Sequence, residues 1–94
     1  MHAIIATIRV KAGNEKDFEA VALELVKQVN EKEPGCRLYT LARGETPLVY
    51  TFIERYVDQA AMDQHRAADH FRELGRKMGQ FMDGKPEILR LTEL

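Results

Sequence analysis

The chain has 94 residues, a formal net charge of −1 and a single cysteine. This length suits one core, so residues 1–94 are expected to form one domain. The near-neutral charge disfavours nucleic acid as a partner, and a lone Cys36 excludes an internal disulfide and a cysteine-based structural metal site. With one cysteine, a cytoplasmic, reducing location is the expected default. The N-terminal apolar run is too short and too soon charged for a signal peptide or a membrane span.

The N-terminal third predicts a strand followed by a helix. Apolar and β-branched residues alternate over 3–10, as in a strand with two partly apolar faces. Asn14 is the expected N-cap of a helix that continues to about Lys32 and is ended by Pro34-Gly35. Its apolar stripe consists of Phe18, Val21, Ala22, Leu25 and Val29.

The middle of the chain predicts a β-hairpin. Strands over 37–43 and 48–56 are joined by the turn residues 44–47, so they should pair antiparallel. The second strand carries large apolar groups on both sides, and each of its faces therefore needs a cover.

The last third predicts a helix in two pieces and a final strand. Asp58 is the expected N-cap of a short helix that reaches about Arg66, and Asp69 can cap a longer piece after a break at 67–69. Phe71, Leu74, Met78 and Phe81 recur at helical spacing in that longer piece. Residues 87–93 have the alternation of a strand.

The order β-α-β-β-α-β predicts an α+β, ferredoxin-like fold with an antiparallel sheet. Right-handed crossovers place both helices on one side, which leaves the other face bare. One set among Ile5, Leu41, Val49 and Ile53, or the alternate set, would then expose more apolar area than a monomer usually tolerates. We expect a second copy to cover it, giving a face-to-face homodimer, a dimeric α+β barrel.

His65 and Glu54 are the strongest candidates for catalytic residues. His65 follows Ala61 by one helical turn, so it should point inward, either as a hydrogen-bonded core residue or as a proton acceptor. Glu54 shares a strand face with Phe52 and Tyr56, and a carboxylate on an apolar wall needs a partner. His65 or an arginine is the expected partner, in a structural ion pair or a catalytic one.

The remaining candidates are aromatic or lie near the helix break. Tyr39 and Tyr50 are wall residues whose hydroxyls can orient a ligand oxygen. His70 follows His65 by five positions across the break, so the two do not form an i, i+4 metal pair, and no metal site is expected. It either caps the break or reaches the cavity mouth. Cys36 is expected to fill space.

Three pieces of the sequence carry a family resemblance. They are Glu33-Pro34-Gly35-Cys36 with Tyr39, Glu54-Arg55-Tyr56 followed by Asp58 and Ala61, and His65 followed by His70-Phe71. In their order and spacing the chain resembles the antibiotic biosynthesis monooxygenase family of small dimeric α+β barrels. That family includes quinol monooxygenases, haem-degrading enzymes and a sugar isomerase. The haem-degrading members use a tryptophan beside the porphyrin, and this chain has none.

The resemblance implies a cofactor-independent monooxygenase that acts on a small aromatic quinol or phenol with dioxygen. His65 would be the base or orienter and Glu54 would hold its tautomer. Tyr39, Tyr50, Phe52, Phe71 and His70 would contact the substrate. No cofactor-binding motif is present, so no cofactor is expected and the electrons would come from the substrate. The alternatives are a non-catalytic small-molecule-binding or stress-response dimer, and a small-metabolite isomerase on the same fold.

Overall fold

The computed structural model describes residues 1–94 and contains four strands and three helices. In chain order they are β1 (His2–Arg9), α1 (Glu15–Lys32), β2 (Cys36–Arg43), β3 (Val49–Tyr56), α2 (Gln59–Ala67), α3 (Asp69–Gly79) and β4 (Glu87–Thr92). The predicted α+β ferredoxin-like order is confirmed, including the division of the second helical region around Ala68. None of the helices is both long and apolar enough to cross a membrane.

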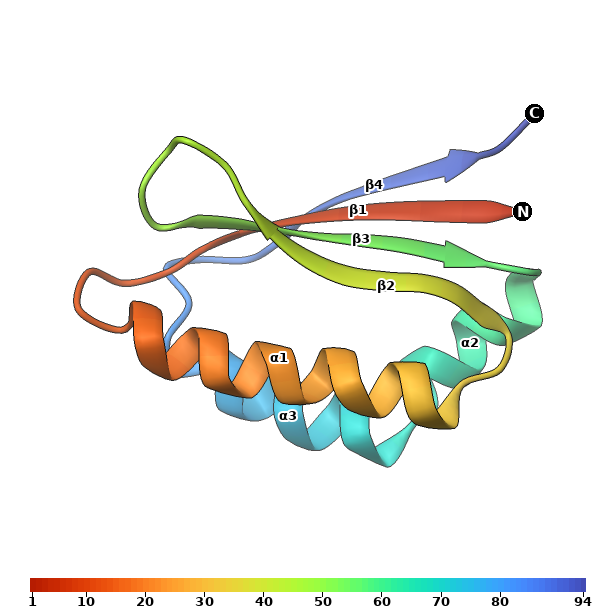
Figure 1. The fold of residues 1–94 in the computed structure, drawn as a ribbon, viewed down its shortest axis with the longest axis horizontal. Helices are drawn as coiled ribbons and strands as arrows, with labels where there is room; N and C mark the ends of the chain where they lie inside the picture. Colours follow the sequence, from red (N-terminus) through yellow and green to blue (C-terminus); the bar gives the residue numbers. More distant parts are fainter.

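The four strands form one antiparallel sheet in the order β2-β3-β1-β4. All three helices lie on one side of it, and the opposite face carries no helix (Figure 1). The register of β1 places Ile5 opposite Ile53 of β3 and opposite Leu89 of β4. The bare face predicted from the sequence is therefore present.

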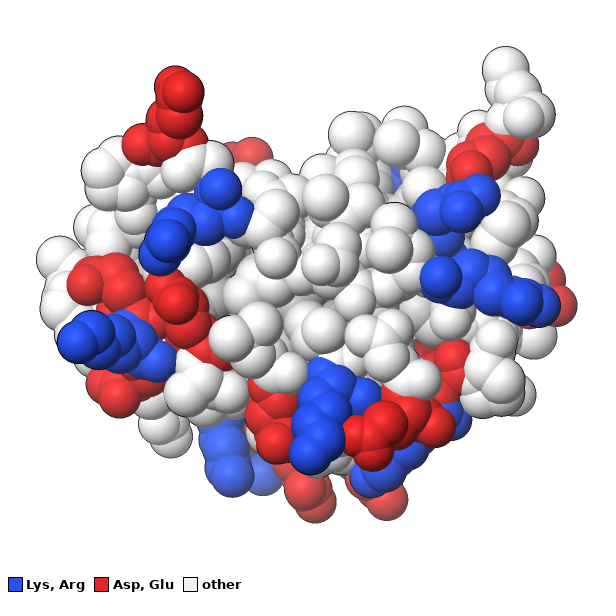
Figure 2. Space-filling model, viewed as in Figure 1, with Lys and Arg blue, Asp and Glu red and all other residues white.

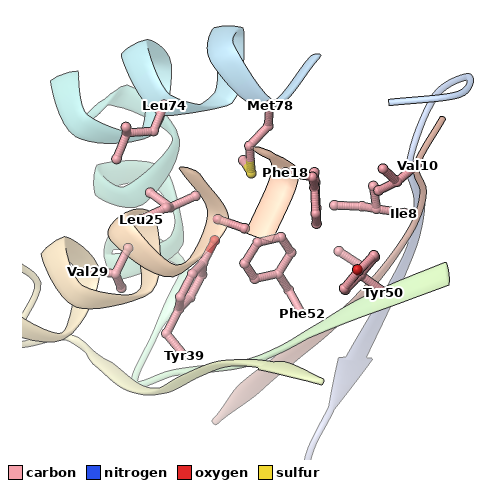
Figure 3. Close-up of a cluster of buried hydrophobic side chains, with 12 residues drawn as sticks. Ile8, Val10, Phe18, Leu25, Val29, Tyr39, Tyr50, Phe52, Leu74 and Met78 are labelled. Atoms are coloured by element: carbon pink, nitrogen blue, oxygen red, sulfur yellow. The ribbon is translucent and has the colours of Figure 1, made fainter. Parts of the chain in front are cut away.

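The core fills the space between the sheet and α1 (Figure 3). Its largest cluster comes from β1 and the residue after it, from β2 and β3, and from α1 and α3: Ala6, Ile8, Val10, Phe18, Ala22, Leu25, Val29, Tyr39, Tyr50, Phe52, Leu74 and Met78. Leu41 packs against this cluster, so its expected place on the bare face was wrong. It pairs with Phe52, and residues directly opposite each other in a sheet share a face.

The caps of α2 and α3 differ from each other. The Asp58 side chain accepts a hydrogen bond from the Ala61 N–H at 2.9 Å, which confirms the predicted N-cap of α2. Asp69 is the first residue of α3 rather than its cap, and Ala68 occupies the N-cap position in extended conformation. The predicted capping role of Asp69 was wrong by one residue, so its charge lies within the first turn, where the helix dipole favours an acid.

The start of α1 lies where the sequence predicts it, but Asn14 forms no side-chain cap. Its φ of −105° and ψ of 13° are not the extended conformation in which a side chain reaches the next turn. The Gly13 N–H instead donates to the Glu15 carboxylate at 2.6 Å. Over the helical layer, acidic and basic side chains are intermixed, as expected for a solvent-facing surface (Figure 2).

Candidate active site

A cavity of about 670 Å³ lies between the helix-facing side of the sheet and helices α2 and α3. Such a volume is in the range of small-molecule sites. It exists because β4 has no helix packed against it, so Ile88 and Arg90 form one wall while α3 forms the other. Gly75 and Gly79 face it from α3, and a Cβ at either would meet no atom within 4 Å. The missing side chains keep the cavity wide.

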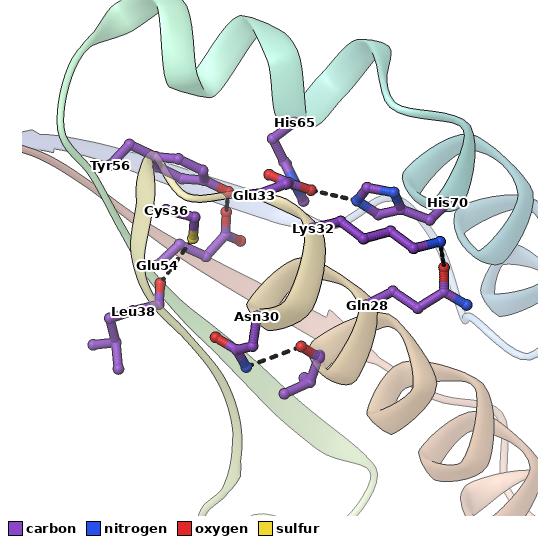
Figure 4. Close-up of polar contacts among 11 residues, drawn as sticks. Gln28, Asn30, Lys32, Glu33, Cys36, Leu38, Glu54, Tyr56, His65 and His70 are labelled. Atoms are coloured by element: carbon purple, nitrogen blue, oxygen red, sulfur yellow. Dashed lines mark hydrogen bonds and ion pairs between the residues drawn. The ribbon is translucent and has the colours of Figure 1, made fainter.

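His65 is the buried imidazole on the cavity wall, and its residue is only 4% exposed. Its Nδ1 lies 3.0 and 3.1 Å from the two carboxylate oxygens of Glu33 (Figure 4). Aromatic rings of Tyr39, Tyr56 and Phe71 surround it, with centroids 5.2, 5.6 and 4.5 Å away. Because a carboxylate accepts, Nδ1 carries the hydrogen and Nε2 is left as a proton acceptor.

Glu33, rather than Glu54, is the carboxylate that holds His65, so the expected pairing was wrong. Glu33 is the C-cap residue of α1, and the turn after it packs closely on α2. A Cβ on Gly35 would lie 2.7 Å from that of Ala61, and the Gly35 carbonyl accepts from Val57 N–H at 2.9 Å. The absent side chain lets the turn approach α2 and brings Glu33 to His65. The sequence signal was the acid directly before Pro34-Gly35: we interpreted this segment as a helix stop and as part of the family resemblance, and assigned Glu33 itself no role.

His70 lies on the far side of the same carboxylate. Its Nε2 is bonded to Oε2 of Glu33, so Glu33 bridges the two imidazoles, and all three side chains are at least nine-tenths buried. His70 is not on the cavity wall, in contrast to the expected substrate contact. No group of three His, Cys, Asp or Glu side chains is arranged to hold a metal ion.

Glu54 is buried on β3 and also lines the cavity. Its only partner is Tyr56, two residues along the same strand face, whose hydroxyl donates to it at 2.6 Å. The expected ion pair with His65 or an arginine is therefore absent. Burial raises the pKa of Glu54 to about 7, against the lowering effect of the Tyr56 hydrogen bond.

Three of the five expected substrate contacts lie on this cavity. Tyr39, Phe52 and Phe71 line it, and burial raises the pKa of the Tyr39 hydroxyl, which keeps it protonated. Tyr50 does not line it, because its hydroxyl points to α1 and donates to Glu19 at 2.5 Å. The structure thus places Tyr50 and His70 outside the cavity that His65 and Glu54 share.

Three polar atoms of the wall have no partner within the protein. They are Nε2 of His65, the Tyr39 hydroxyl and the second carboxylate oxygen of Glu54. Every fully buried side-chain nitrogen or oxygen has a hydrogen-bond partner, so these three unpaired atoms are not fully buried. Their residues line the cavity, which is where a ligand could meet them. An acceptor, a donor and a titratable oxygen thus face one apolar space.

The protonation state of His65 follows from its burial. Burial lowers its pKa, and this outweighs the raising effect of the Glu33 hydrogen bond and charge. At neutral pH the imidazole is neutral and can take a proton.

Cys36 lies beside this site without the properties of a nucleophile. Burial and the nearby Glu33 charge raise the pKa of its thiol to about 11, and the thiol donates to the Leu38 carbonyl. A protonated thiol is a poor nucleophile, so the expected role as a small packing residue agrees with its surroundings.

The model of the antibiotic biosynthesis monooxygenase family matches residues 1–77. The chain belongs to this family. No curated protein matches it. Family membership supports a monooxygenase-type function.

Solved structures show the same fold. A protein of Caulobacter crescentus CB15, assigned as an antibiotic biosynthesis monooxygenase, is 35% identical over 99% of this chain and 89% of its own, with a TM-score of 0.95. A conserved protein of Methanosarcina mazei Go1 is 26% identical over 99% of this chain and 92% of its own, with a TM-score of 0.92. The fold that positions His65 and Glu54 is therefore shared with these solved structures.

Proposed function

We propose that this protein is a cofactor-independent monooxygenase that oxidises a small aromatic quinol or phenol with dioxygen. The observation that carries the proposal is the His65 imidazole: it is buried and neutral, Glu33 fixes its Nδ1, and its Nε2 is open to an apolar cavity. A neutral base in an apolar site is what a phenolic hydroxyl needs to form a reactive anion.

The first half of the reaction moves one proton and forms one bond. A hydroxyl of the quinol gives its proton to Nε2 of His65, and the Glu33 carboxylate stabilises the imidazolium. The electron-rich anion passes one electron to dioxygen, and the two resulting radicals combine at a ring carbon that bears hydrogen. The imidazolium returns its proton to this peroxide, so His65 is neutral again.

The second half releases water. The proton on the oxygenated ring carbon leaves to Nε2, a carbonyl forms at that carbon, and the O–O bond breaks. The departing hydroxide takes the proton from the imidazolium and becomes water. One oxygen atom stays on a hydroxyquinone, the other is in water, and all four electrons come from the substrate.

The other groups on the wall position the ring. The Tyr39 hydroxyl can donate to one substrate oxygen, and the free oxygen of Glu54 can bond the second. Phe52 and Phe71 cover the ring faces. Water is kept from the peroxide by this apolar wall.

Oxygen uptake with 1,4-dihydroxynaphthalene, corrected for its autoxidation without protein, tests the proposal. His65→Ala should lower turnover by about a hundredfold or more and leave the protein folded. His65→Gln keeps a hydrogen-bonding side chain without the base, and should be equally slow. Gln64→Ala, on the exposed side of α2, is the matched control and should keep full turnover.

The outcomes separate the proposal from its alternatives. One oxygen atom from dioxygen should appear in the hydroxyquinone product. Near-normal turnover in His65→Ala would remove His65 from the mechanism. If no quinol in a panel is oxidised faster than its autoxidation, the binding-protein or isomerase interpretation takes the place of the monooxygenase.

A further inference from the structure

Three arginines stand around the cavity and come from three different elements. Arg66 follows His65 on α2, Arg72 follows Phe71 on α3, and Arg90 lies on β4, where it pairs with Ile4. All three line the cavity, and all three are exposed to solvent at the residue level. Their stems lie along an apolar space while their charged ends remain hydrated.

None of these arginines has an acidic partner. The ion pairs of the protein involve Arg9, Arg43 and Arg55 and the two histidines at Glu33, but no arginine of the cavity. Asp69 lies three positions from both Arg66 and Arg72 in sequence, and it pairs with neither. Arg37 and Arg76, which lie outside the cavity, have no carboxylate partner either, so the cavity arginines are distinguished by their place: three of them, from three elements, line one apolar space.

The cavity contains one acid to set against three guanidinium groups. That acid is Glu54, which is shared with Tyr56 and readily holds its proton. The wall otherwise consists mainly of apolar side chains, so it combines an excess of positive charge with an apolar interior. Arginine is the residue whose planar fork matches a carboxylate, with two parallel hydrogen bonds.

We propose that the cavity takes an aromatic anion, a ligand whose ring lies in the apolar wall and whose carboxylate lies among Arg66, Arg72 and Arg90. The anionic group is separate from the hydroxyl that reacts at His65. As a substrate class, this inference rests on the proposed monooxygenase function. As a statement about binding it stands without the reaction, and the two are tested apart.

Binding is measured with a pair of ligands that cannot be oxidised. Naphthalene-2-carboxylate and naphthalene-2-carboxamide share their ring and nearly their shape, and differ in charge. Calorimetry at low ionic strength should give a dissociation constant about tenfold lower for the carboxylate, as expected for one charge-assisted contact. Added salt should reduce that preference, because the arginines are hydrated and screened.

Variants of the exposed arginines identify the source of the preference. Arg72→Gln and Arg90→Gln should each reduce it about threefold or more, and Arg72→Lys should retain part of it through the charge alone. Arg76→Gln, an exposed arginine of α3 outside the cavity, is the matched control and should change nothing. Equal affinity for the two ligands, or a preference that survives unchanged in both Arg72→Gln and Arg90→Gln, would overturn the inference.

Oxygen uptake separates this inference from the proposed reaction. With 1,4-dihydroxynaphthalene-2-carboxylate and its carboxamide, kcat/KM should favour the carboxylate by about the same factor as the binding measurement. Preferential binding of the carboxylate without any oxygen uptake would support the anion site and refute the monooxygenase. Equal oxidation of both quinols, with no charge preference in binding, would do the reverse.

Discussion

At the residue scale, Glu33 connects the two buried histidines of the candidate site. One buried carboxylate accepts from Nδ1 of His65 and bonds Nε2 of His70, so it fixes the tautomer of the ring that faces the cavity. His70 gives the carboxylate a second partner, which a buried charge needs. In the proposed reaction Glu33 is therefore a positioning residue that acts through His65.

The Glu33→Gln variant tests that role. The Glu33 charge raises the pKa of His65 against the lowering effect of burial, so its removal should lower that pKa further. The acidic limb of the kcat/KM profile should move to lower pH. Maximal turnover should fall by about tenfold or more, because the imidazolium formed in the reaction loses its counter-charge.

Glu31→Gln is the matched control for Glu33→Gln, since it removes an exposed acid from the same helix end. It should leave both the pH profile and turnover unchanged. A merely structural Glu33 would change the melting temperature without moving the acidic limb. That result would show that His65 does not depend on it for catalysis.

The burial of Glu54 predicts how the stability of the protein, rather than its turnover, depends on pH. Burial raises its pKa to about 7 in the folded protein, compared with 4.5 as the reference value. Between these pH values the folded state holds the proton more tightly than the unfolded state. Stability from this residue is therefore fully present below about pH 4.5 and is lost as the pH rises through about 7.

The Glu54→Gln variant removes this dependence. Between pH 4.5 and 7 the free energy of unfolding should decline more in the wild type than in the variant. The difference should reach up to roughly 3 kcal/mol, since each pKa unit corresponds to about 1.4 kcal/mol. Urea unfolding at several pH values measures the difference. If the free energy of unfolding changes with pH in the same way in both proteins, ionisation of Glu54 does not destabilise the folded state.

At the element scale, the hydrophobic periodicity of the sequence predicted the helices and strands, but not the contacts between them that build the site. Every strand boundary lies within one residue of its predicted position, because alternation and turn residues are local signals. The break at Ala68 was equally visible. The Glu33 to His65 contact joins residues 32 positions apart through the packing of a turn on a helix, and no local pattern encodes it.

Gly35 is the residue on which that turn depends. Gly35→Ala would place a methyl group 2.7 Å from the Ala61 side chain, so the turn or α2 must move. Overpacking of this kind costs about 1 to 3 kcal/mol of stability. Displacement of the turn also moves Glu33, so turnover should fall along with the melting temperature.

Gly44→Ala is the control for Gly35→Ala, because nothing lies within 4 Å of the added carbon. It should change the melting temperature and turnover little. If Gly35→Ala is as stable and as active as Gly44→Ala, the close approach of the turn to α2 does not position Glu33.

At the scale of the whole molecule, the bare sheet face has one mainly apolar row of residues and, beside it, a row that also contains a charge. In one row Thr40, Ile53, Ile5 and Leu89 lie side by side across the four strands. The neighbouring row consists of Leu38, Arg55, Ala3 and Leu91, and its one charged member, Arg55, is paired with Glu93. The sequence indicated an apolar face but misplaced Leu41, because a one-residue change of register exchanges the faces of a strand, and register was not fixed by local residues.

We propose that a second copy of the chain covers this face in a homodimer. Leu89 and Leu91 remain 54% and 45% exposed in the single chain, next to the less exposed Ile5 and Ile53. An exposed patch of large apolar side chains on a bare sheet face is typical of an interface rather than of a surface in water. An identical copy supplies the complementary surface through a two-fold axis.

Leu89→Lys tests the dimer. Light scattering of the wild type at micromolar concentration should give about twice the chain mass of 10.8 kDa. Leu89→Lys should shift the equilibrium toward the monomer, because the dimer would bury two ammonium groups in an apolar interface. Leu23→Lys on α1 is the matched control: Leu23 is 53% exposed but lies on the helical side, so the dimer should persist. A wild type that remains monomeric, or equal mass for both lysine variants, would show that the bare face is not the interface.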